Sequence, residues 1–186
     1  MNSKILLVDD EPNVISALAR SLFDEPYEIL SELSGEMALE TLRETPVKVV
    51  VSDEKMARMS GSEFLSQVRE LYPHTVRIML TGHATLDAAM RAVNEGEIYR
   101  FFSKPWDDTV LKFAIRSAIE KFDLEEENRR LLATLRQQSL EIKVLEKRYP
   151  GITRVEKDDR GALVLPDISD VDLHAMLTEC DSEAVS

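Results

Sequence analysis

Carboxylates follow two apolar segments of the chain and could hold a cation together. Asp9 and Asp10 follow the apolar run 5–8, and Asp53 ends a segment that begins with the valines at 49–51. Such runs predict buried strands, and open α/β sheets bind ligands at the carboxyl ends of their strands. Taken alone, Asp53 is most simply a cap of the following helix. Three carboxylates at one sheet edge need a cation between them, because packed like charges are costly, so together they predict a divalent-metal site.

The first hundred residues alternate between short apolar runs and amphipathic segments, which predicts five βα units. Strands are expected at 5–8, 27–33, 49–53, 76–80 and 98–102. Helices are expected after Pro12, after Ser34 as N-cap, after Gly61 and over about 85–94. The inward faces of the second and third helices are predicted to contain Met37, Ala38 and Leu42, and Phe64, Leu65, Val68 and Leu71.

Four motifs at the predicted strand ends resemble the receiver domain of two-component response regulators. They are Val8-Asp-Asp-Glu-Pro12, Ser52-Asp53 with Met56, Met59 and Gly61, Leu80-Thr-Gly-His-Ala84, and Phe102-Ser-Lys-Pro-Trp106. The resemblance covers residues 1–122 and implies a flavodoxin-like, doubly wound parallel sheet of order 2-1-3-4-5. It also implies that Asp53 is the phosphoacceptor.

The resemblance assigns a role to each candidate site residue. Phosphoryl transfer to a carboxylate brings negative oxygens together, so the site needs a divalent metal and fixed positive charge. Mg²⁺ would be bound by Asp10, Asp53 and the backbone carbonyl of Lys55, with Asp9 acting through a bound water. Contacts to the phosphoryl group would come from Thr81 and Lys104, and Lys104 is followed by a prolyl bond that is cis in the family.

Two positions depart from the usual pattern of the family. Many receivers have Met-Pro after the acceptor, whereas this chain has Met56-Ala57, which removes a φ restraint from the loop. The aromatic switch position is Phe101 in place of the frequent Tyr, so it lacks a hydroxyl; ordinary core packing is the alternative interpretation of this residue.

The stretch 94–106 resembles a narrower group of receivers that often precede an HD-GYP phosphodiesterase or an AAA+ activator. The sequence contains no Gly-Tyr-Pro, no Walker loop, and no His followed by Asp. No enzymatic output is therefore predicted beyond self-phosphorylation and self-dephosphorylation.

Composition and charge limit the remaining possibilities. The chain has 186 residues, a net charge of −12 and one cysteine. By segment, residues 1–106 carry 11 basic and 17 acidic side chains, residues 107–149 carry 9 of each, and residues 150–186 carry 3 and 9. This distribution argues against a nucleic-acid-binding surface. Because Cys180 has no internal partner and the first apolar run is too short for a signal or a membrane span, we expect a cytoplasmic protein without membrane insertion.

A long helix is predicted after the receiver. Residues 107–148 contain neither Gly nor Pro, and a heptad seam recurs at steps of four and three: Leu124, Asn128, Leu131, Leu135, Gln138, Ile142, Leu145 and Tyr149. We interpret residues 123–149 as a coiled coil that forms a parallel homodimer; a solitary helix that folds back on the receiver is the alternative. Residues 150–186 are expected to be an acidic tail with a small hairpin at 152–165 and a short helix at 171–177.

The predicted function is that of a response regulator phosphorylated on Asp53 that signals through dimer geometry and protein contacts. Its partners would be a sensor histidine kinase or phosphotransfer protein and a downstream protein. One alternative is a phosphate sink whose role is phospho-Asp53 turnover. Another is an RNA-binding antiterminator, which the acidic tail disfavours.

Overall fold

The computed structural model describes residues 3–82, 98–149, 156–157 and 163–164. The chain divides into two compact units, residues 1–131 and residues 132–186. No helix within the described ranges is both long enough and apolar enough to cross a bilayer.

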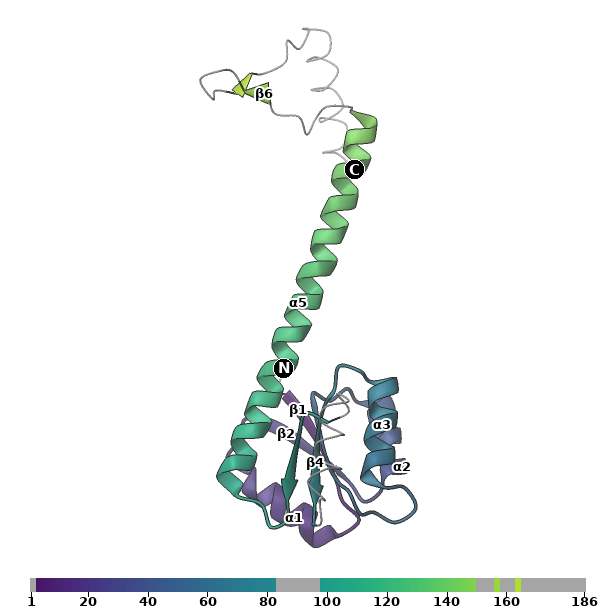
Figure 1. Ribbon diagram of the computed structural model, residues 1–186, viewed down its shortest axis with the longest axis vertical. Coiled ribbons are helices and arrows are strands. Elements are labelled where there is room, and N and C mark those ends of the chain that lie inside the picture. The colour runs from purple at the N-terminus through teal and green to yellow at the C-terminus, as the bar shows by residue number, and fades with distance from the viewer. Residues whose placement is uncertain (1–2, 83–97, 150–155, 158–162, 165–186) are drawn as a thin grey trace, which may run out of the picture. The chain divides into compact units, whose positions relative to one another are not determined.

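The first unit is built on a five-stranded parallel sheet (Figure 1). Its order, β2-β1-β3-β4-β5, confirms the predicted flavodoxin-like topology. The strands match the predicted runs to within two residues at either end: β1 (Ser3–Val8), β2 (Tyr27–Glu32), β3 (Val49–Asp53), β4 (Val76–Thr81) and β5 (Arg100–Ser103).

Within the described residues, four helices connect to or follow these strands: α1 (Pro12–Ser21), α2 (Gly35–Glu44), α3 (Gly61–Leu71) and α5 (Asp108–Arg148). The Ser34 hydroxyl caps α2 by accepting from the amide of Met37 at 3.2 Å, as predicted. Ser60 and Glu63 form a capping box at the start of α3. The helix expected over residues 85–94 lies outside the described residues.

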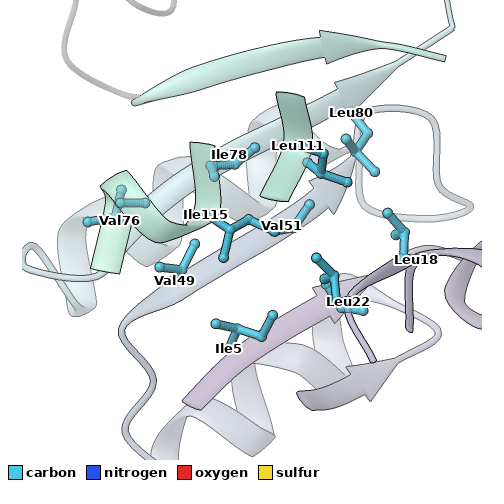
Figure 2. Packing of buried hydrophobic residues seen from close by; sticks show 12 residues of the cluster. Ile5, Leu18, Leu22, Val49, Val51, Val76, Ile78, Leu80, Leu111 and Ile115 are labelled. Atoms are coloured by element: carbon cyan, nitrogen blue, oxygen red, sulfur yellow. The ribbon is translucent and has the colours of Figure 1, made fainter. Parts of the chain in front are cut away.

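Alternation along the strands produces two separate core layers. In β1, Ile5 and Leu7 face one layer while Leu6 and Val8 face the other. Figure 2 shows the first layer, which α1 closes with Leu18 and Leu22 and α5 closes with residues such as Leu111 and Ile115. The second layer is closed by α2 and α3 with Ala38, Leu39, Leu42, Phe64, Leu65 and Val68. Both faces of the central strands are therefore buried, which explains their continuous apolar sequence.

Two residues predicted to face inward do not do so. Met37 in α2 and Leu71 at the end of α3 are 50% and 58% exposed. Met37 lies in the first turn of α2 and Leu71 is the last residue of α3, where a helix leaves the sheet. Helical periodicity identifies the side of a helix but not how far the neighbouring layer extends along it.

The second unit contains the remainder of α5 and two short strands. β6 (Glu156–Lys157) pairs antiparallel with β7 (Leu163–Val164). A hairpin was predicted in this part of the chain, with its first strand at 152–155. That range lies outside the described residues, and so does the predicted helix at 171–177.

Candidate functional site

Three carboxylates meet at the carboxyl edge of the sheet. β1 and β3 are adjacent parallel strands with Val8 opposite Ser52, so the residues that follow them lie side by side. Asp9, Asp10 and Asp53 each offer an oxygen, and these oxygens all lie within 4.8 Å of one another. Asp9 and Asp53 are buried, whereas Asp10 is exposed. The arrangement is therefore a charged cluster with one open side.

Lys104 joins two of these carboxylates from the end of β5. Its Nζ lies 2.7 Å from Oδ2 of Asp9 and 2.6 Å from Oδ1 of Asp53. The backbone amide of Lys104 donates to the carbonyl of Thr81 at 2.8 Å, which ties the start of this loop to the end of β4. The Lys104–Pro105 peptide bond is cis. The ammonium is thus fixed beside the predicted phosphoacceptor.

Burial and pairing shift the pKa values of Asp9 and Lys104. Loss of hydration raises the pKa of Asp9, while its hydrogen bonds from Lys104 and from the amide of Glu11 oppose that rise. For Lys104, burial favours the neutral amine, but the hydrogen bonds to Asp53 and Asp9 outweigh it and raise its pKa. Lys104 therefore remains a cation at neutral pH and partly balances the buried acids.

The loop between β3 and α3 points backbone amides at the cluster. The amide of Lys55 donates to Oδ2 of Asp53 at 2.9 Å, and the amide of Ala57 donates to Oδ2 of Asp10 at 3.0 Å. The loop closes where the amide of Gly61 donates to the carbonyl of Glu54 at 2.9 Å. A Cβ at Gly61 would press against the carbonyl oxygen of Asp53 and lie 2.8 Å from Cα of Glu54, so this close approach requires glycine.

The other predicted residues lie at the same edge or in the core beneath it. Thr81 is the last residue of β4, is 5% exposed and neighbours Ser103 of β5. Phe101 in β5 lies opposite Met79, is half-buried and packs on the second core layer. Its present contacts are those of an ordinary core residue.

The donor set suits a small, hard divalent cation. Carboxylate oxygens, with a backbone carbonyl and waters, are the ligands that Mg²⁺ prefers, and one exposed carboxylate leaves the cluster open for waters that Mg²⁺ retains. Three acids against one shared ammonium leave net negative charge, which favours a bound cation. Among the described residues, Asp9, Asp10 and Asp53 are the one group of three possible ligands that lie this close together.

The amide of Ala57 was not among the predicted site groups. Alanine in place of proline was expected only to remove a φ restraint, although it also restores a backbone N–H. That replacement was the signal that could have indicated a backbone donor at this position.

Comparison with known proteins identifies the same region. Residues 5–116 match the family model of the response regulator receiver domain. The hydrogenase transcriptional regulatory protein HoxA of Cupriavidus necator is 37% identical over 132 residues, which cover 71% of this chain and 27% of HoxA. The transcriptional regulatory protein GlrR of Escherichia coli is 30% identical over 143 residues, or 77% of this chain and 32% of GlrR. The chain thus spans between a quarter and a third of these relatives.

Solved receiver domains have the same fold. The signal receiver domain of an HD domain-containing protein from Pseudomonas fluorescens shares 37% identity at a TM-score of 0.63, covering 66% of this chain and 98% of that chain. A response regulator receiver domain protein from Clostridium thermocellum shares 33% identity at a TM-score of 0.61, with the same coverage. The family match, the relatives and the sheet order agree, and the chain belongs to the response regulator receiver domain family.

Proposed function

We propose that this receiver accepts a phosphoryl group on Asp53, with Mg²⁺ bound by Asp10, Asp53 and the carbonyl of Lys55. The observation that carries the proposal is the position of Asp53. It ends the central strand inside the acidic cluster, and one of its oxygens lies 2.6 Å from the ammonium of Lys104. The bound Mg²⁺ would supply positive charge for the oxygens of the transferred group.

The residues of the chain orient the acceptor and balance its charge. In the transfer, an oxygen of Asp53 forms a bond to phosphorus as the bond from phosphorus to the donor breaks, and the rest of the donor leaves with the electron pair of the broken bond. The amide of Lys55 and the ammonium of Lys104 each bind one oxygen of Asp53 and fix the plane of the carboxylate before the donor arrives.

After transfer, Lys104 and the Thr81 hydroxyl would contact phosphoryl oxygens, since both residues lie at the strand ends beside the acceptor. Asp9 would be held in place by Lys104 and the amide of Glu11 and would orient a metal-bound water. Phe101 would respond to movement at the ends of β4 and β5.

Intact-mass spectrometry tests this assignment. The protein is incubated with acetyl phosphate and Mg²⁺, and one phosphoryl addition is expected. Asp53→Asn should abolish the phosphoryl addition because it removes the nucleophile. Asp10→Asn should remove the dependence of the addition on Mg²⁺, because it removes a proposed metal ligand. A phosphorylated Asp53→Asn protein would contradict the proposal.

The family match supports a chain that accepts a phosphoryl group, and we propose no enzymatic activity for it beyond its own phosphorylation chemistry. We propose a histidine kinase or phosphotransfer protein as the upstream partner and a protein as the downstream partner. HoxA and GlrR are transcriptional regulators by name, but this chain matches less than a third of each, so their output is not transferred to it.

We further propose that α5 pairs two copies of the chain along the seam that begins at Leu124. Within the first unit, the helix is tied to the receiver by Lys48–Asp123 at 2.6 Å and by His74–Arg129 at 2.9 Å. Arg129 is half-buried, whereas the seam residues Leu124 and Asn128 are exposed. The receiver contacts and the seam therefore occupy different faces of α5.

The seam is mostly apolar, and its leucines and isoleucine are in contact with solvent from Leu124 to Leu145. Leu131, Leu135, Ile142 and Leu145 are all between 46% and 59% exposed, and a heptad repeat is complementary to a second copy of itself. Light scattering is the test, and the parent should have the mass of a dimer. The double variant with Leu131→Asp and Leu135→Asp should be a folded monomer that is still phosphorylated on Asp53. A parent that is monomeric at tens of micromolar would refute the pairing.

A further inference from the structure

The three carboxylates of the site are held by different kinds of groups. Asp9 and Asp53 are buried and share the ammonium of Lys104, and each also accepts one nearby amide. Asp10 is exposed, and its Oδ2 accepts the amide of Ala57, a residue 47 positions further along the chain. The contact of Asp10 thus joins the loop that follows β1 directly to the loop that follows β3.

This contact depends on the residue type at position 57. Proline has no backbone N–H, so a proline here could not donate to Asp10. Any other residue could donate, because the donor belongs to the main chain. Residue 57 therefore determines the contact with Asp10 by whether it carries a backbone N–H.

We propose that the amide of Ala57 is a positioning donor that holds Asp10 beside Asp53 for cation binding. An exposed aspartate otherwise samples several rotamers, and the entropy lost when the cation orders it reduces the affinity of the site. The hydrogen bond engages Oδ2 and leaves Oδ1 available as a ligand. This inference rests on the proposed Mg²⁺ site and adds a determinant of its affinity.

The direct test is Mg²⁺ binding without any phosphodonor. Isothermal titration calorimetry with MgCl₂ compares the full-length parent with Ala57→Pro, which removes the donor. Loss of a group that orients a metal ligand typically weakens binding by about tenfold or more, and for an exposed ligand we expect roughly five- to tenfold. A proline variant that binds Mg²⁺ as tightly as the parent, or more tightly, would overturn the inference.

Proline also stiffens the loop, so two matched variants separate the effects. Ala57→Ser retains both the donor and an ordinary φ range, and Ala57→Gly retains the donor while loosening the loop. Both should bind Mg²⁺ within about twofold of the parent if the donor is the determinant. A glycine variant as weak as the proline variant would show that Mg²⁺ binding is lost even when the donor is present, and would contradict the proposed role of the amide.

Amide exchange of the parent gives a second measurement that needs no proline variant. The Ala57 amide should exchange slowly in the parent, measured by NMR in the presence of EDTA, and quickly in Asp10→Ala. Equal, fast exchange in both proteins would overturn the inference. A parent that binds no Mg²⁺ would overturn both this inference and the proposed metal site. A parent and a proline variant that bind Mg²⁺ equally well would overturn this inference alone.

Discussion

Two segments of α5 carry leucines in opposite environments. Leu111, with Ile115 and Ala118, is completely buried against the sheet, whereas Leu135 and Leu140 are 59% and 63% exposed. The first segment is stabilised by the receiver core, which it completes (Figure 2). The second leaves apolar surface in water, and burial of that surface against a partner would be favourable. One helix thus combines a segment that serves folding with a segment suited to association.

The comparison is sharpest when the same substitution is made in both segments. Leu111→Ala should lower the free energy of unfolding by about 2–5 kcal/mol, because it opens a cavity in a closed core. Leu140→Ala, which removes the same atoms from an exposed site outside the proposed seam, should change it by less than about 0.5 kcal/mol. Urea unfolding followed by circular dichroism gives both values, and similar losses in the two variants would show that the segments do not differ.

Within the receiver, glycines near the site form a second contrast. Gly61→Ala should cost about 1–3 kcal/mol, because its Cβ would meet the backbone of Asp53 and Glu54 and force the loop to move. Gly82→Ala, just after β4, should be nearly neutral, since an added Cβ there meets no atom of the described residues within 4 Å. Thermal unfolding distinguishes them; a neutral Gly61→Ala would indicate that the loop yields without cost.

The ionised carboxylate of Asp9 should lower the free energy of unfolding, whereas the apolar core beneath it raises that free energy. Burial raises the pKa of Asp9, so the folded state binds a proton more readily than the unfolded state. Ionised Asp9 therefore destabilises the fold at neutral pH, and this cost disappears as the pH falls below the unfolded value near 3.8. Asp9→Asn should therefore raise the free energy of unfolding at pH 7 in EDTA, because asparagine carries no charge to bury.

The pH profile checks that assignment. The difference between Asp9→Asn and the parent should shrink as the pH approaches 4, while Asp10→Asn, at an exposed position, should stay within about 0.5 kcal/mol of the parent. An Asp9→Asn protein less stable than the parent at pH 7 would show that the ion pair with Lys104 outweighs the loss of hydration.

Much of the fold was predictable because its signals are local. Strand runs buried on both faces, and capping residues such as Ser34, determine the order of the elements and their bounds to within a few residues. Met37 and Leu71 were predicted wrongly, because the exposure of a residue at a helix end depends on where the neighbouring layer stops.

The clustering of the candidate side chains was predictable, because it follows from the order of the strands. The strand ends bring Asp9, Asp10 and Asp53 together, and Lys104 reaches Asp9 and Asp53 from the end of β5. The amide of Ala57 could not be read in the same way, because a backbone donor is present at nearly every position and only the fold selects which one is used. Likewise, the pair Lys48–Asp123 joins residues 75 positions apart and has no local signal.

The most direct measurement identifies the phosphorylated residue itself. The protein is treated with acetyl phosphate and Mg²⁺ and then with borohydride, which reduces an acyl phosphate to an alcohol and so converts a phosphorylated aspartate to homoserine. Peptide mass spectrometry is expected to find homoserine at position 53 and unchanged aspartate at positions 9 and 10. Homoserine at position 9 or 10, or at no position despite a phosphodonor and Mg²⁺, would contradict the assignment of Asp53 as the phosphoacceptor.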